Sequence, residues 1–221
     1  MPSLTENLEQ LYTELRATEP QPITNLLLEV KNKNGELHKN YPSGWKFKMV
    51  MDIPSLEILD HGGIYVFWWL NDSPERLQPL FAPDCTRTYS VKGKKVVGED
   101  EPDAYHSVEI EWTDAWLTKY QGHIPLYVGK SADRILKRMA LHLQIHQAKY
   151  TGKTTSDQLR RGMERLFQSH ANTADIIVNH VGFSYIPLHG VEHVVNRFYL
   201  EDYAIGKLMP LFNVDIERQV R

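Results

Sequence analysis

The stretch Ile124-Pro-Leu-Tyr-Val-Gly-Lys-Ser131, with the run 132–148 behind it, is the most informative part of the sequence. Its first residues are apolar and end at Gly129, a pattern typical of a short buried strand. Ser131 is a good N-cap, and apolar residues recur behind it at helical spacing: Ile135, Leu136, Met139 and Leu143. A strand that turns into a helix in this way directs backbone N–H groups at an anion. The stretch therefore predicts a phosphate site at a strand-to-helix corner.

The composition is that of an ordinary globular chain. It has 221 residues, of which 42% are hydrophobic and 24% charged, so we expect one elaborated domain or one domain with an extension. No apolar run reaches the roughly 18 residues of a membrane span, and no signal peptide opens the chain. The single cysteine, Cys85, rules out an internal disulfide and is typical of a reducing compartment. We therefore expect a cytoplasmic protein without a membrane partner.

The distribution of charge is more informative than the net charge of −3. Residues 130–165 contain nine lysines and arginines against three acidic residues, whereas residues 97–117 contain seven acidic residues and no lysine or arginine. A basic sector beside an acidic one suits a protein that binds a polyanion on one face only. A solvated basic helix surface would give the same pattern, and charge alone does not decide between the two.

Periodicity and turn residues predict the remaining elements. The run Gly62–Leu70 is the most β-prone of the chain, and it is expected to be a core strand. The other expected elements are an N-terminal helix behind a capping box at Ser3, a strand at 23–30, a hairpin at 86–97 around Lys92-Gly93-Lys94, a strand at 107–112, a basic helix from Ser156 through Phe167, a strand or strand pair at 174–188 and a last helix at 190–208.

Two tempting motifs are rejected. Gly129-Lys-Ser131 and Gly152-Lys-Thr154 resemble the end of a P-loop, but the leading glycine that such a loop needs is replaced by Ile124 and Gln147. His142 and His146 have a spacing that can hold zinc on a helix. No glutamate follows the first histidine and no third ligand is near, so the pair does not indicate a zinc site.

An ordered set of residues resembles the GIY-YIG nuclease family. Its members are Gly63-Ile-Tyr65, Tyr127-Val-Gly129, Arg138, Glu201 and Asn213, and they span about two thirds of the chain. Arg138 follows the second tripeptide by the distance seen in the family, and the ending Leu-Glu…Pro-x-x-Asn is similar to the family's C-terminal signature. Each residue taken singly also fits an ordinary structural or surface role. The order and spacing of the whole set favour a site.

The resemblance implies an α+β fold with a small central sheet flanked by helices. Residues 1–61 would be an N-terminal extension and residues 62–221 the nuclease domain. Sixty-one residues separate Tyr65 from Tyr127, many more than in compact members of the family, so 71–123 would be an insertion that carries the hairpin. A histidine four residues after the arginine, His142, is similar to the type II restriction endonuclease branch.

For phosphodiester hydrolysis, the resemblance assigns Arg138 to a non-bridging phosphate oxygen, a task that suits its fixed, permanently charged fork. Glu201 would be the metal ligand for Mg²⁺ (or Mn²⁺), an ion that keeps most of its waters and accepts a further ligand from phosphate. The metal would offset charge on the leaving oxygen. Lys130 would lie beside the same phosphate.

Tyr65 and Tyr127 are the candidates for the water side of the reaction. A phenol with a pKa near 10 is a poor base at pH 7, so nearby positive charge would have to lower its pKa. We expect Tyr65 to act on the water with His142 as proton relay, and Tyr127 to orient water or phosphate, although the sequence does not distinguish the two tyrosines. Asn213 is expected to brace the site by hydrogen bonds.

Basic residues on and after the central helix are expected to position the duplex on its phosphates. They are Lys130, Arg134, Lys137, Lys149, Lys153, Arg160, Arg161 and Arg165. Of these, Arg160 or Arg161 could instead read a guanine, because an arginine fork matches the major-groove edge of that base. The insertion 71–123 is expected to reach toward base edges.

The sequence thus predicts a hydrolase, a Mg²⁺-dependent, site-specific endodeoxyribonuclease of a restriction system. We expect it to act on double-stranded DNA as a homodimer, with a partner methyltransferase modifying the same site as a further possibility. The alternatives left open are a DNA-binding or regulatory protein of the same fold that has lost cleavage and a nuclease toxin of low specificity.

Overall fold

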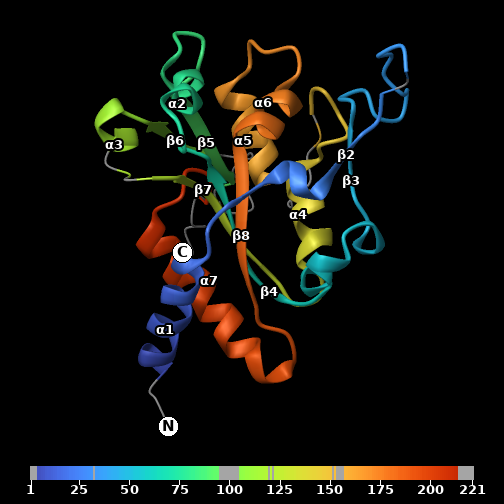
Figure 1. Cartoon of the computed structure of the whole chain (residues 1–221). Helices are drawn as coiled ribbons and strands as arrows, with labels where there is room; N and C mark the ends of the chain where they lie inside the picture. The colour runs from blue at the N-terminus through green and yellow to red at the C-terminus, as the bar shows by residue number, and fades with distance from the viewer. Residues whose placement is uncertain are drawn as a thin grey trace, which may run out of the picture.

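The computed structural model describes residues 4–31, 33–94, 105–118, 120, 122–150, 152 and 157–213. At its centre lies a four-stranded antiparallel sheet in the order β1-β8-β4-β7 (Figure 1). These strands are β1 (Gln21–Pro22), β8 (Val181–Pro187), β4 (Gly63–Trp69) and β7 (Ile124–Ser131). The fold is α+β, as the sequence predicts, and the expected strands within 62–70, 125–129 and 174–188 do pair in one sheet.

Strand β4 is the middle of the core because it pairs on both edges and all seven of its residues are buried. Its alternate side chains enter two separate apolar clusters. Tyr65, Phe67 and Trp69 face one cluster, whereas Ile64, Val66 and Trp68 face the other. Such an uninterrupted apolar strand requires cover on both faces of its sheet.

Helices supply that cover in two layers. On the side of Tyr65, apolar residues pack from α4 (Ile135–Leu143), α5 (Gln158–Leu166) and α6 (Thr173–His180). On the opposite side pack α1 (Leu4–Ala17) and α7 (Val194–Leu208), which lie against each other (Figure 1). The molecule therefore has three layers, with the sheet between two layers of helices.

The N-terminal segment is part of this body. Strand β1 adds an edge to the central sheet beside β8, and α1 packs on α7 through a T-shaped contact between Tyr12 and Tyr203, whose ring centroids lie 5.5 Å apart.

The remaining elements are η1 (Ile23–Leu26), β2 (Leu27–Glu29), β3 (Trp45–Phe47), η2 (Val50–Asp52), η3 (Pro54–Asp60), α2 (Pro74–Phe81), β5 (Thr88–Lys94), β6 (Tyr105–Glu111), α3 (Asp114–Thr118) and η4 (Val191–His193).

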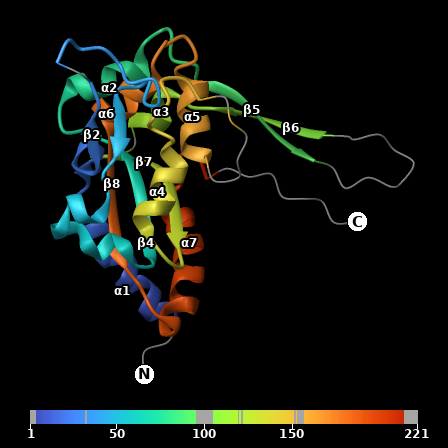
Figure 2. The same cartoon turned by 90° about the vertical axis from the view of Figure 1, so that its right-hand side faces the viewer.

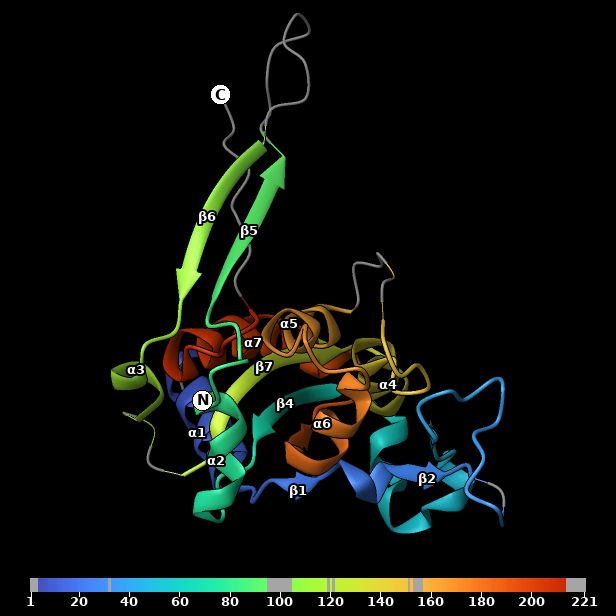
Figure 3. The same cartoon turned by 90° about the horizontal axis from the view of Figure 1, so that it is seen from above.

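The hairpin of the insertion differs from its prediction. Lys92-Gly93-Lys94 do not form a turn; they continue β5, and the partner strand is β6, with Gly93 opposite His106. The two strands form a ribbon that extends away from the body (Figures 2 and 3). Residues 98–103, which belong to the acidic part of the sequence, lie outside the described residues.

Three further expectations are corrected. Residues 174–180 belong to helix α6, because Ala174, Ile177 and Val178 are buried at helical spacing. The expected strand at 23–30 is a 3₁₀ turn followed by the short β2. Strand β7 continues through Ser131, so α4 begins only at Ile135 and ends before Gln144, which adopts a left-handed φ of 42°. Ser3 and Ser156, the two predicted caps, lie outside the described residues.

Among the described residues, no helix has both the length and the apolar character that crossing a membrane requires.

Candidate active site

Tyr65 and Tyr127 lie on neighbouring strands and on the same face of the sheet. Tyr65 is opposite Gly129, and Phe67 is opposite Tyr127, so the two tyrosines are diagonal neighbours. Both enter the cluster beneath α4, and their ring centroids are 6.5 Å apart. The two tripeptides of the sequence are thus brought together by the β4–β7 pairing.

The glycine of the second tripeptide makes room for the first tyrosine. A Cβ atom at Gly129 would lie 2.5 Å from the hydroxyl oxygen of Tyr65 and 2.8 Å from the ring of Tyr127. Any other residue at this position would push the Tyr65 phenol away from the strand. Gly129 is therefore needed for the position of Tyr65.

Helix α4 places His142 against both phenols. Its ring centroid lies 4.5 Å from that of Tyr127 and 6.1 Å from that of Tyr65. Arg138 lies one helical turn earlier, and residues four apart share a helix face. Among the described residues, neither ring nitrogen of the buried His142 nor the buried hydroxyl of Tyr65 has a hydrogen-bond partner of standard geometry. Such atoms are rare in folded proteins and indicate a place for water or a ligand.

The electrostatics of the cluster keep all three rings neutral at pH 7. Burial raises the pKa of Tyr65 well above 10, and Tyr127 and Glu201 add to this effect, while Arg138 lowers the pKa. Burial and Glu201 likewise raise the pKa of Tyr127, and Arg138 opposes them. Burial, and then the charge of Arg138, lowers the pKa of His142 to about 3. Arg138 is therefore the cation that acts on every ring of the cluster.

Glu201 reaches the site from α7 and is held by Lys130 of β7. Its Oε2 atom is 2.6 Å from Nζ of Lys130, and its Oε1 atom accepts a hydrogen bond of 3.1 Å from the backbone N–H of the same lysine. The Lys130 ammonium also lies 4.6 Å from the centroid of the Phe198 ring. The Glu201 side chain keeps 17% of its surface exposed, which leaves it accessible to a ligand.

The predicted phosphate site at the strand-to-helix corner is not formed by backbone N–H groups. The N–H of Lys130 donates to Glu201, and that of Ile135 donates to the carbonyl of His61 at 3.0 Å. Arg134 holds the N-cap position without a capping side-chain hydrogen bond. The prediction was wrong on this point because Gly129-Lys-Ser131 are still part of β7, and α4 begins only at Ile135.

Asn213 holds the backbone between the second tyrosine and its glycine. Its Oδ1 atom accepts from the N–H of Val128 at 2.6 Å, and its Nδ2 atom donates to the carbonyl of Val128 at 2.8 Å. The N–H groups of Leu211 and Phe212 donate to Pro125 and Leu126 in the same way. Residues 211–213 thus run along the outer edge of β7 and fix Tyr127, which is the bracing role expected of Asn213.

One predicted DNA contact, Arg160, is wrong, because its side chain has no exposed surface. Its guanidinium donates to Oε1 of Glu164 at 2.9 Å and to the carbonyls of Gln147 and Ala148 at 2.8 and 2.9 Å. Glu164 also accepts a hydrogen bond from the N–H of Tyr150. The ion pair of Arg160 and Glu164 thus connects the segment after α4 to α5. Arg160 is a structural residue that cannot reach a duplex.

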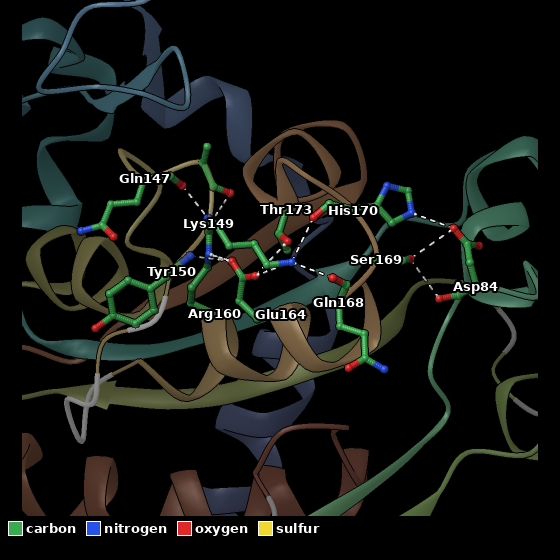
Figure 4. Close-up of polar contacts among 11 residues, drawn as sticks. Asp84, Gln147, Lys149, Tyr150, Arg160, Glu164, Gln168, Ser169, His170 and Thr173 are labelled. Carbon is green, nitrogen blue, oxygen red and sulfur yellow. Dashed lines mark hydrogen bonds and ion pairs between the residues drawn. The ribbon is translucent and has the colours of Figure 1, made fainter.

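Lys149 takes part in the same network. Its ammonium donates to the carbonyls of Gln168 and His170 at 2.8 and 3.0 Å and lies 3.6 Å from Glu164 (Figure 4). Glu164 was not predicted as part of a site, although its spacing of four residues from Arg160 is that of a helical ion pair. Lys149 is therefore committed to internal contacts, even though its side chain is partly exposed.

The other predicted DNA contacts have different surroundings. Arg161 pairs with the buried carboxylate of Asp157 at 2.6 Å. Exposed side chains are found at three of the positions, namely Arg134, Lys137 and Arg165. Lys153 lies outside the described residues. The basic sector of the sequence is therefore partly internal.

The described residues contain no cluster of three or more histidine, cysteine, aspartate or glutamate side chains that could enclose a metal ion. Glu201 offers one partly exposed carboxylate. That donor set suits an ion that takes most of its ligands from water and phosphate, as Mg²⁺ does.

Comparison with known proteins gives no match to a family model, to a curated protein or to a solved structure. The function is therefore argued from the site itself.

The buried His142 predicts a loss of stability in mild acid. Its pKa is about 3 in the folded chain and near 6.5 when exposed, so between these values only the unfolded chain binds the proton. The neutral His142 therefore does not lower the free energy of unfolding above pH 6.5, and it lowers that free energy progressively as the pH falls below 6.5. From pH 7 to pH 5 the cost is about 2 kcal/mol. Urea unfolding at the two pH values should show this loss, and His142→Phe should lack that part of it. An equal loss in the variant would contradict the assignment.

Proposed function

We propose that this chain is a Mg²⁺-dependent endonuclease of the GIY-YIG type that hydrolyses phosphodiester bonds of double-stranded DNA at specific sites. The observation that carries the proposal is the convergence of Tyr65, Tyr127, Arg138, His142 and Glu201 from four elements of the fold. A set of polar groups that is distant in sequence, buried and partly without hydrogen-bond partners is typical of a catalytic site.

Arg138 and Lys130 supply the positive charge that a phosphodiester needs. Arg138 is close enough to both phenols to lower their pKa values, so a phosphate that contacts its guanidinium would also lie near the phenols. Lys130 is bound to Glu201, and its partly exposed ammonium can turn to a phosphate oxygen that enters beside it. The two cations would hold non-bridging oxygens and stabilise the charge that develops on them.

Glu201 would hold the metal ion together with an oxygen of the substrate phosphate and several waters. When bound there, Mg²⁺ would supply positive charge to the departing 3′ oxygen. Lys130 now occupies both oxygens of this carboxylate, so ligand binding would have to exchange that contact. When the metal ion takes the place of Lys130 on Glu201, the freed ammonium of Lys130 would turn to the phosphate, so that metal binding and phosphate binding would occur together.

The tyrosines and His142 would handle the proton of the attacking water. In the free protein both phenols stay protonated at pH 7, and the neutral imidazole of His142 can accept a hydrogen bond. Water held by the Tyr65 hydroxyl would pass its proton through the phenol to an imidazole nitrogen as its oxygen attacks phosphorus. Tyr127, fixed by Asn213 on the adjacent backbone, would orient the water or the phosphate.

The wider setting of the proposal is a type II restriction-like enzyme in the cytoplasm that acts as a homodimer on a palindromic site, with Mn²⁺ as a possible substitute for Mg²⁺. A methyltransferase that protects the same site would be its natural partner. The exposed arm β5–β6 has the form of a two-stranded ribbon, which fits a major groove (Figure 3).

Incubation of the purified chain with supercoiled plasmid and Mg²⁺ tests the proposal. We expect discrete linear fragments, with no cutting when a chelator is present. A smear of fragments would indicate a nuclease of low specificity. Intact plasmid that is nevertheless retarded in a gel would support the alternative of a DNA-binding protein without cleavage.

A further inference from the structure

A groove runs along the face of α4 that is turned away from the tyrosines. Two adjoining depressions of about 380 Å³ each share Phe47, Lys137 and Ala140 in their walls. One continues to η2 and η3, and the other continues to the segment after α4. The opposite wall is formed by the N-terminal segment that carries β3, η2 and η3. The two depressions therefore form one continuous groove, which we call the α4–β3 groove.

The walls of this groove are basic. Four cations line it against the single carboxylate of Asp60: Lys46, Lys48, Arg134 and Lys137. Among the described residues, the side chains of Lys46 and Lys137 have no hydrogen-bond or ion-pair partner, and Lys48 donates only to the carbonyl of Asn25 at 3.0 Å. Arg134 is half exposed and lies 3.8 Å from Asp60. The positive charge of these side chains is available to a ligand, because carboxylates of the protein neutralise only a small part of it.

The position of the groove relates it to the candidate active site. Lys137 and Arg138 are consecutive residues on one helix, so their side chains leave the helix about 100° apart. Arg138 acts on the tyrosines, whereas Lys137 lines the groove, and the helix between the two sides is about 10 Å across. A duplex carries a phosphate every few ångströms along each strand. A strand held in the groove would thus be anchored within a few nucleotides of the candidate site.

We propose that the α4–β3 groove binds the phosphate backbone of a DNA duplex, with Lys46, Lys48 and Lys137 as direct phosphate contacts. The proposal rests on the proposed function for the identity of the partner. It moves the main backbone contacts away from Arg160 of α5 and Lys149 of the segment before α5, which are committed to internal bonds, to the groove between α4 and the N-terminal segment. A nucleotide backbone fits because the cations are spaced along an elongated groove instead of converging on one point.

The test measures binding and not cleavage. In a Glu201→Gln background, a mixed-sequence duplex of about 30 base pairs is titrated by fluorescence anisotropy at several salt concentrations. The triple variant Lys46→Gln, Lys48→Gln, Lys137→Gln should weaken binding by roughly tenfold to a hundredfold and reduce the salt slope by about three. Lys137→Gln alone, at an exposed helix position that does not affect folding, should reduce the slope by about one.

The control is Lys207→Gln, an exposed lysine of α7 that contacts Tyr203 in the opposite helical layer. It should leave affinity and slope unchanged. Equal binding by the parent, Lys137→Gln and the triple variant would overturn the groove as a DNA contact, and so would a parent that binds no duplex. A wild-type chain that binds through these lysines but never cuts plasmid would refute the proposed nuclease activity and leave the groove assignment in place.

Discussion

Replacement of Glu201 by glutamine is expected to abolish plasmid cleavage while leaving the fold and most of the DNA binding intact. Glutamine keeps the size of the side chain and an oxygen that can accept from the N–H of Lys130, but it removes the charge that a metal ion requires. Loss of several kcal/mol of charge stabilisation corresponds to a rate lower by about a thousandfold or more. The ion pair with Lys130 is partly exposed, so its loss should cost at most about 1 kcal/mol of stability.

The matched control is Asp202→Asn, which removes the same charge from the neighbouring, exposed position of α7. It should cut plasmid at the wild-type rate under the same Mg²⁺ concentration. Cleavage that survives in Glu201→Gln, or that disappears equally in both variants, would show that Glu201 is not the metal ligand. Thermal unfolding of the two variants checks that any loss does not come from the fold.

Replacement of Tyr65 by phenylalanine should reduce activity strongly and change stability little. The hydroxyl is buried and, besides the Arg138 guanidinium that acts on its pKa, has no hydrogen-bond partner among the described residues, so its removal should change the stability of the fold by no more than about 1 kcal/mol. If this hydroxyl takes the proton of the attacking water, cleavage should fall by about 10²–10⁴-fold. A purely structural tyrosine would not combine these results.

Tyr185→Phe is the control, because Tyr185 lies directly opposite Tyr65 on β8 and faces the same cluster. Its loss should leave cleavage unchanged. If Tyr65→Phe cuts plasmid at the wild-type rate, then Tyr127, or His142 alone, takes the proton of the attacking water. Urea unfolding of both variants measures the stability, and the rate of plasmid nicking measures the activity.

Strand β4 and the first part of β7 could be predicted because both are continuous apolar runs. Such segments are buried on both faces, so neighbouring structure hardly affects their assignment. Helix α6 could not be predicted in the same way. Ile176, Ile177 and Val178 have high β propensity, but burial of one side at helical spacing outweighs local preference. Gly93 was taken for a turn residue although it continues a strand, a case in which the pairing partner decides the structure.

For the candidate site, the sequence indicated the residues but not their surroundings. The pairing of β4 with β7 brings Tyr65 to Gly129, and only coordinates could show that the phenol lies over the glycine. Arg160 has the sequence context of a surface residue. Its burial depends on carbonyls of the segment after α4, whose position is set by tertiary packing. For the same reason Lys46 of β3 and the following Lys48 gave no signal, since they become part of a groove only beside α4.

The bonds between Asn213 and Val128 also affect the order of events during synthesis. Chains begin to fold from the N-terminal side while the ribosome is still adding residues. The elements that carry Tyr65, Tyr127 and Arg138 leave the ribosome before α7, which carries Glu201, and the support of β7 arrives last, with Asn213. In the proposed nuclease, a nascent chain that has not released residue 213 would lack a finished catalytic centre. For an enzyme that cuts DNA, such late assembly would keep incomplete translation products harmless to the chromosome of the cell that makes them.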